Sequence, residues 1–129
     1  MFTISFYEDE KGRCAFRDFL QMLHDTGNSA FYKAAAFLDY LEEKGTSPDR
    51  PVCKPFGSTI YMHCIEDFIR AAGEHKEVCV ILYGQYSVDS FVLLHHFFSE
   101  QIPRIVPPGQ MCQAAGKLRK HLRARGCLS

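Results

Sequence analysis

Several features that would identify a function directly are missing from this chain. It has no Trp, no CxxC pair, no glycine-rich phosphate loop, no GxSxG nucleophile motif and no pair of carboxylates at catalytic spacing. No apolar run approaches the roughly 18 residues that a membrane-spanning helix needs. These absences argue against a P-loop phosphate site, a serine nucleophile of that type, a cysteine-ligated metal site and a membrane span.

The composition indicates one folded domain. The chain has 129 residues, of which 47% are hydrophobic, and eleven of them are Phe. That is enough apolar material to fill a core at this size, so disorder over most of the length is not expected. We therefore expect a single domain spanning residues 1–129.

Charge is distributed unevenly along the chain although the formal net charge is zero. All fifteen acidic residues lie between Glu8 and Glu100, whereas six of the fifteen Lys and Arg lie in the last 27 residues. The last 27 residues therefore carry +6, and the first 102 carry −6. Such asymmetry is typical of a basic surface for nucleic acid or an acidic partner, and it equally fits an exposed helix with solvated charge.

The six cysteines indicate reduced thiols rather than a disulfide framework. Met1 leads directly into an alternating segment, residues 2–6, and then into acidic residues, which is not the pattern of a secretory signal. No Cys/His spacing matches a metal site, and several of the cysteines lie inside apolar runs. We expect a cytoplasmic protein whose cysteines are reduced and largely buried.

Apolar periodicity predicts an α+β protein. Period-2 alternation or β-branched and aromatic enrichment predicts strands at 2–7, 60–69, 77–83 and 90–98. Helical spacing of apolar residues predicts helices at 13–25, 30–44 and 110–124. We expect Gly27 to end the first helix, Ser29 to cap the second, and Gly45 to end it.

The connections set the topology. Residues 45–51 are predicted to be a loop, and residues 72–74 and 84–89 are predicted to be turns. Short turns imply antiparallel neighbours, so we expect a twisted antiparallel sheet in the order β-α-α-β-β-β-α. A two-helix hairpin would cover one side, followed by a C-terminal helix.

Several residue strings resemble the RelE/HigB family of type II toxin–antitoxin systems, and phage-derived HigB-like proteins in particular. Residues 6–13 (FYEDEKGR), followed by Phe19-Leu20, are similar to a family opening of FYxDxxG and then a helix carrying FL. Residues 91–97 (FVLLHHF) are similar to the family's last strand, IVLLHGF. Tyr61 after Gly57 and the pair Leu82-Tyr83 match the family's GLYELR and RVLY segments in part.

The resemblance implies a RelE-like fold and a cytoplasmic toxin that binds the ribosome and cleaves mRNA. The reaction would use neither a metal nor a cofactor, because the RNA's own 2′-hydroxyl attacks the adjacent phosphate. A cognate antitoxin would hold such an mRNA interferase inactive.

The chain departs from the family where that reaction needs cations. Cys64 and Val80 stand at the positions of two family arginines, and Ser99-Glu100 stands where the family has paired lysines. A glutamate at that place repels phosphate. Because removal of one charge-stabilising group costs roughly 100- to 1000-fold in rate, loss of several would abolish cleavage.

The residues that remain for catalysis come from separate segments. His95 keeps its place near the end of the last strand, where an imidazole with a pKa of roughly 6.5 suits proton transfer, although it also fits a strand histidine packed beside Phe97. His96 should point to the opposite face of the sheet. The full candidate catalytic set is His95, His63, Tyr83, Arg70 and Arg104.

The other candidate residues also fit purely structural roles. Tyr83 and Tyr61 would orient a base or stack on a nucleotide, or else lie at the edge of the core with solvated hydroxyls. Arg70 and Arg104 would replace a lost cation, or remain plain surface residues. The histidines predict no metal site, because the sequence suggests no third ligand beside them.

The C-terminal helix is the strongest electrostatic candidate. It would follow RNA phosphates without reading sequence, dock an acidic protein, or stay solvated. The cations that we assign to RNA binding are Lys117, Arg119, Lys120 and Arg123.

Two hypotheses follow. The first is an active ribosome-dependent mRNA interferase, which requires Arg70, Arg104, His63 and His95 to converge on one concave face of the sheet. The second is a non-catalytic binding protein on a RelE-like scaffold, such as an inhibitor encoded by a phage or mobile element and acting through protein or RNA contacts. Fold alone does not decide between them.

Overall fold

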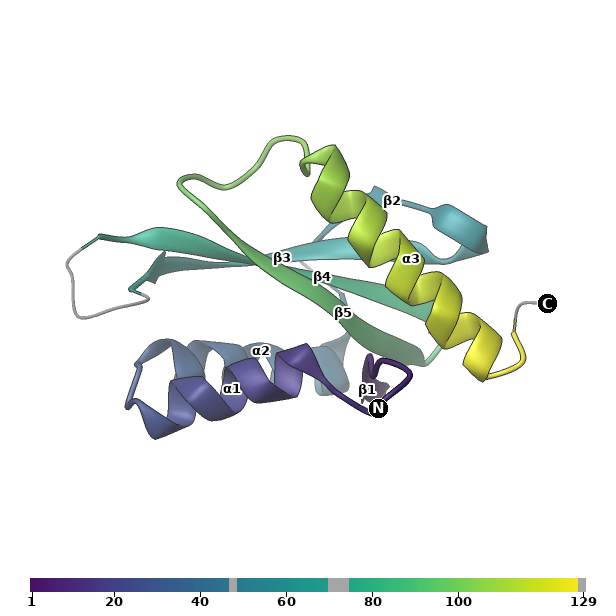
Figure 1. Ribbon diagram of the computed structural model, residues 1–129, viewed down its shortest axis with the longest axis horizontal. Coiled ribbons are helices and arrows are strands. Elements are labelled where there is room, and N and C mark those ends of the chain that lie inside the picture. The colour runs from purple at the N-terminus through teal and green to yellow at the C-terminus, as the bar shows by residue number, and fades with distance from the viewer. Residues whose placement is uncertain (47–48, 70–74, 128–129) are drawn as a thin grey trace.

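A computed structural model describes residues 1–46, 49–69 and 75–127 (Figure 1). The chain forms a five-stranded sheet with helices on both faces. The strands are β1 (Thr3–Phe6), β2 (Arg50–Cys53), β3 (Thr59–Phe68), β4 (Glu77–Ser87) and β5 (Ser90–Ser99). The helices are α1 (Ala15–Asp25), α2 (Ala30–Lys44), α3 (Pro108–Ala124) and a short 3₁₀ turn, η1 (Pro55–Gly57). No helix in the described part of the chain is long and apolar enough to cross a membrane.

The sheet is mixed, in the strand order β1-β5-β4-β3-β2. Strands β2 to β5 pair antiparallel with their neighbours, whereas β1 pairs parallel with β5 at the edge. The α+β class is confirmed, and each predicted helix and strand is present. The predicted order β-α-α-β-β-β-α is not confirmed, because the chain contains one more strand, β2, between α2 and β3. The expectation of a purely antiparallel sheet is wrong, because the first strand, β1, lies beside the last strand, β5, and runs parallel to it.

Two predicted connections are shorter than expected. The predicted loop 45–51 overlaps a strand, because β2 begins at Arg50. The predicted turn 84–89 shrinks to Val88 and Asp89, because β4 runs on to Ser87. Gly84 is not a turn residue: a Cβ atom there would lie 3.2 Å from the Leu118 side chain, so this glycine makes room for α3. The predicted turn at 72–74 lies outside the described residues.

The helix ends follow the sequence with one correction. Gly45 ends α2 with a φ of 85°, as predicted. The Ser29 side chain makes no capping hydrogen bond. Instead, Asn28 Oδ1 accepts a 2.9 Å hydrogen bond from the Ala30 amide, and Asn28 Nδ2 donates to the Ile69 carbonyl. Asn28 therefore caps α2 and ties it to the end of β3.

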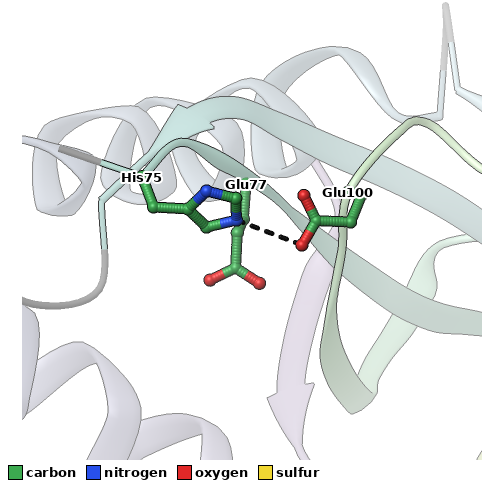
Figure 2. Close-up of side chains that lie close together, drawn as sticks. All are labelled: His75, Glu77 and Glu100. Atoms are coloured by element: carbon green, nitrogen blue, oxygen red, sulfur yellow. Dashed lines mark hydrogen bonds and ion pairs between the residues drawn. The ribbon is translucent and has the colours of Figure 1, made fainter. Parts of the chain in front are cut away.

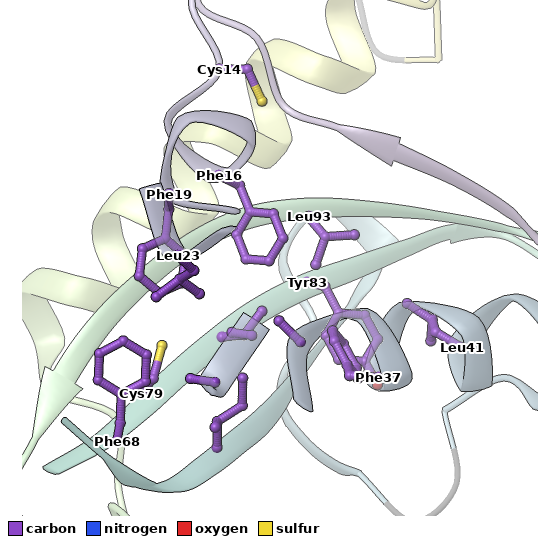
Figure 3. Packing of buried hydrophobic residues seen from close by; sticks show 14 of the residues in the cluster. Cys14, Phe16, Phe19, Leu23, Phe37, Leu41, Phe68, Cys79, Tyr83 and Leu93 are labelled. Atoms are coloured by element: carbon purple, nitrogen blue, oxygen red, sulfur yellow. The ribbon is translucent and has the colours of Figure 1, made fainter. Parts of the chain in front are cut away.

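Two cores lie on opposite faces of the sheet. The α1–α2 hairpin covers one face, on which Phe19, Leu23 and Phe37 pack against inward-facing strand residues such as Tyr83 (Figure 3). Helix α3 covers the other face (Figure 1). Leu118 of this helix is fully buried there. Because β4 is covered on both sides, its segment 78–83 is a continuous apolar run rather than an alternating one.

All six cysteines are free thiols, and the expectation that they are largely buried holds for only some of them. Cys14 and Cys79 are buried, Cys53 and Cys64 are half-buried, and Cys112 and Cys127 are exposed. Burial raises the pKa of the Cys64 thiol to about 11 and that of Cys79 to about 12, which keeps both protonated.

Candidate nucleic-acid interface

Among the described members of the predicted catalytic set, His63 and Tyr83 lie together, whereas His95 and Arg104 lie apart from them. His63 and Tyr83 lie on the face of the sheet that α2 covers, whereas His95 lies under α3. Arg104 is exposed in the segment between β5 and α3, and its carbonyl accepts a hydrogen bond from Arg50. Arg70 lies outside the described residues. The convergence that the interferase hypothesis requires is therefore absent among the described members of the set.

His63 and Tyr83 belong to a polar cluster centred on Asp49. The Tyr83 hydroxyl donates to Asp49 Oδ2 at 2.5 Å, and His63 Nδ1 lies 2.9 Å from Asp49 Oδ1. The His63 ring stacks on Phe37 at 3.9 Å, and Tyr83 is fully buried. Burial, reinforced by the Asp49 carboxylate, raises the pKa of the Tyr83 phenol and keeps it a donor. The cluster fixes residue 49 to the sheet, and it leaves Tyr83 no open face on which a base could stack.

His95 takes part in a second polar cluster, with two residues of α3. Its Nε2 atom lies 2.6 Å from Gln110 Oε1, and its Nδ1 atom lies 2.9 Å from Lys117 Nζ. Because an ammonium group only donates, Nδ1 is the acceptor, and Nε2 carries the proton given to Gln110. Burial, opposed by Gln110 and reinforced by Lys117, lowers the pKa of His95, and burial also lowers the pKa of Lys117. His95 is therefore a neutral imidazole that positions the Lys117 amine.

His96 points to the opposite face, as strand alternation predicts. Its ring stacks on Phe19 of α1 at 4.2 Å. Burial, with smaller contributions from His95 and Lys117, lowers the pKa of His96 to about 4. It is a half-buried histidine that packs against α1.

Two adjoining hollows lie between α3 and the N-terminal segment of residues 4–18. The larger hollow, of about 650 Å³, is lined by residues that include Ser5, Tyr7, Lys120 and Arg125. The smaller hollow, of about 330 Å³, is lined by residues that include Tyr7 and Lys117. Tyr7 and Asp9 line both hollows, so the two hollows form one continuous surface, which we call the α3 seam.

The acidic side chains of the N-terminal turn have cationic partners. Asp9 accepts from Arg13 Nε at 2.8 Å, and Glu8 accepts from Arg17 Nη2 at 3.3 Å. Backbone and side-chain hydrogen bonds from Arg13 lower the pKa of Asp9, so this carboxylate stays ionised and paired. The cations that α3 contributes are therefore not neutralised by these two acids.

The basic residues of α3 divide into two groups. Lys117 and Lys120 line the α3 seam, and Lys117 Nζ lies 6.0 Å from the centre of the Tyr7 ring. Arg119 and Arg123 are exposed and line neither hollow. All four were predicted from sequence to bind RNA, and two of them, Lys117 and Lys120, line a concave surface.

Sequence reasoning missed other residues of the α3 seam. Arg125 donates to His121 Nε2 and to Ser5 Oγ, and its guanidinium lies 5.3 Å from the centre of the Tyr86 ring. The position of Arg125 in the basic C-terminal segment could have marked it as a candidate for RNA binding. Tyr7 was noted only as part of a family string, since nothing in the sequence reveals that the first strand lies beside the last helix.

Neither hollow gathers a set of metal-ligating side chains. Within the described ranges, the group that does so is His75, Glu77 and Glu100, at the other end of β5.

The sequence matches no protein-family model and no curated protein sequence. The resemblance to RelE/HigB toxins therefore rests on the residue strings alone.

Proposed function

We propose that this protein is a RelE/HigB-like cytoplasmic protein that binds single-stranded RNA along the α3 seam. The observation that carries the proposal is the continuous concave surface on which Lys117, Lys120 and Arg125 flank Tyr7. The separation of His63 and Tyr83 from His95 on opposite faces supports binding over catalysis by the predicted residue set.

The chemistry of the α3 seam suits a single strand better than a duplex or a flat acidic protein surface. Grooves that bind single strands combine cations that follow the phosphates with aromatic rings on which bases stack. Tyr7 is half-exposed at the junction of the two hollows, with lysines on both sides of that junction. The hollows also fall in the size range of sites that enclose small groups such as single bases.

The outward-facing cations would act at longer range. Arg119 and Arg123 add positive potential beside the seam, which raises the rate at which a polyanion arrives without fixing its position. The resemblance implies in addition that ribosome-bound mRNA is the target and that a cognate antitoxin is the regulator. An acidic antitoxin segment would compete with RNA for the same surface.

RNA cleavage is a second candidate function, favoured by the contact between Lys117 and His95. Burial lowers the pKa of Lys117, and its amine reaches the smaller hollow, where a phosphate or a 2′-hydroxyl would lie. A neutral Lys117 would accept the 2′-hydroxyl proton, and the freed oxygen would attack phosphorus and displace the 5′-oxygen, which would take its proton from water. The products would carry a 2′,3′-cyclic phosphate and a 5′-hydroxyl.

Binding is tested by fluorescence anisotropy with a labelled single-stranded RNA of about 12 nucleotides. Lys117→Gln/Lys120→Gln removes two charges from the α3 seam, and Arg119→Gln/Arg123→Gln removes two charges from the outer face of the same helix. We expect the seam pair to weaken binding by at least about tenfold and to lower the salt slope by about 1.4, since each phosphate contact on a single strand contributes about 0.7. The outer pair should cost less than about threefold.

The outcomes separate the alternatives. Equal losses from the two pairs would mean diffuse attraction to α3 and would refute the seam. Tighter binding of duplex than of single strand would refute the stacking argument. Fragments with cyclic phosphate ends, lost in Lys117→Gln, would establish the second candidate, whereas intact RNA and intact polysomal mRNA would exclude it.

A further inference from the structure

A compact group of potential ligands lies at the end of the sheet that is remote from the α3 seam. Val78 of β4 pairs with Ser99 of β5, so the residues just outside this pair, Glu77 and Glu100, emerge at the same end of neighbouring strands. His75 precedes Glu77 by two residues, and all three side chains converge (Figure 2).

The ligand atoms are already close enough to share an ion. His75 Nε2 lies 3.1 Å from Glu100 Oε1, and one ligand atom from each of the three residues lies within 4.8 Å of the other two. Each atom would need to move by less than about 1 Å to reach the roughly 2.0–2.2 Å of a zinc bond. The side chains of His75 and Glu100 are 66% and 69% exposed, so they are free to turn and an ion can reach them.

We propose that His75, Glu77 and Glu100 form a binding site for a divalent transition-metal ion such as zinc. One imidazole nitrogen and two carboxylates are a mixed donor set, which suits Zn²⁺ and its first-row neighbours. Magnesium and calcium prefer sets made only of oxygen, and copper(I) prefers sulfur. Three protein ligands leave further coordination positions to water, as in an open site.

The surroundings of the three residues also attract a cation. Glu77 and Glu100 border a hollow of about 470 Å³, which β3 lines with two further acids, Glu66 and Asp67. Lys76 is the one cation among the described residues that line it. Carboxylates held side by side on neighbouring strands repel each other, and a bound cation converts that repulsion into attraction.

A bound ion would connect the start of β4 to the end of β5. It would therefore stabilise this end of the sheet, because metal binding to the folded state alone adds to the free energy of unfolding. This site shares no residue with the α3 seam, so neither proposal depends on the other. It departs from the sequence-based expectation of no metal, which rested on the spacing of the cysteines and on the histidines at 63, 95 and 96.

The test is isothermal titration of the full chain with zinc chloride, followed by thermal unfolding with and without the ion. We expect one ion per chain, and at least about tenfold weaker binding in His75→Ala and in Glu100→Gln. His24→Ala and Glu43→Gln remove the same groups from exposed positions on α1 and α2 and should bind as the parent chain does. The ion should raise the Tm of the parent and not that of His75→Ala.

The exposed thiols Cys112 and Cys127 are the main competitors for zinc. Cys112→Ser/Cys127→Ser should keep the site, and the cobalt(II) form should lack the intense near-ultraviolet band of thiolate ligation. Loss of binding in the cysteine variant, unchanged binding in His75→Ala and Glu100→Gln, or no binding to the parent chain would each overturn the proposal.

Discussion

The hydrogen bond from Tyr83 to Asp49 makes a sharp prediction about stability. Tyr83→Phe removes one hydroxyl from a fully buried side chain and leaves the ring in place. The lost bond is short, at 2.5 Å, and its acceptor is a carboxylate whose side chain is only 13% exposed. We expect the free energy of unfolding to fall by about 2 kcal/mol, since hydrogen bonds to charged groups contribute about 1.5–3 kcal/mol.

Tyr61→Phe is the matched control for this prediction. Tyr61 stacks on Tyr83 with ring centres 5.6 Å apart and is only half-buried, and its hydroxyl has no hydrogen-bond partner among the described residues. Removal of that hydroxyl should change the free energy of unfolding by less than about 0.5 kcal/mol. The two variants lose the same atom from neighbouring rings, so a difference between them reports the Asp49 bond.

Urea unfolding followed by circular dichroism measures both variants, with a reductant present to keep the cysteines free. A loss of about 2 kcal/mol corresponds to a fall in Tm of about 6–10 °C for a chain of this size. The coupling between Tyr83→Phe and Asp49→Asn in a double-mutant cycle should exceed about 1 kcal/mol. Equal stability of Tyr83→Phe and Tyr61→Phe would refute the reasoning, because it would mean that Asp49 is not anchored to the sheet.

Three further predictions follow from the titratable and polar groups. The pKa of His96 is about 4 in the folded state and about 6.5 in the unfolded state, so only the unfolded state takes up a proton between these pH values. The free energy of unfolding should therefore keep its full value above pH 6.5 and fall by about 3 kcal/mol on acidification towards pH 4. This fall should be smaller in His96→Phe than in the exposed control His24→Phe. Iodoacetamide at pH 8 should label Cys112 and Cys127 rapidly, and intact mass should show Cys64 and Cys79 resisting until denaturant is added, because burial raises the pKa of both thiols. His95→Gln keeps an acceptor for Lys117 and a donor for Gln110, so RNA binding should stay within about twofold of the parent, whereas His95→Leu strands the half-buried Lys117 amine and should weaken binding by at least about fivefold.

The elements that sequence reasoning found are those with strong local signals. The bounds of α2 were predicted correctly from the helical spacing of its apolar residues and from Gly45, which adopts a positive φ that other residues rarely adopt. Strand β2 was missed because it has four residues, one of them Pro51, which is tolerated there because β2 is an edge strand. Gly84 was wrongly predicted to lie in a turn, because its role is to make room for Leu118, a residue of α3 that is distant in sequence.

The sites were harder to predict because they depend on register. Asp49 joins His63 and Tyr83 only because β3 and β4 place both rings over the same segment. The group of His75, Glu77 and Glu100 depends in the same way on the pairing of Val78 with Ser99. Neither of these strand registers can be predicted from residue spacing along the chain. Strand alternation alone was enough to send His95 and His96 to opposite faces.

The two positions that the resemblance to RelE/HigB toxins aligns with arginines have a physical interpretation. Val80 is fully buried in the core beneath α3, and Cys64 packs against that core. A guanidinium in place of Val80 would lose its hydration inside this apolar packing, which is costly. By the resemblance, a surface that is cationic in the toxins is here closed by apolar packing. The positive charge of α3 lies at the margin of that packing, where Lys117 and Lys120 meet Tyr7 instead of the centre of the sheet. If RNA binds this protein, it binds beside the sheet and not upon it.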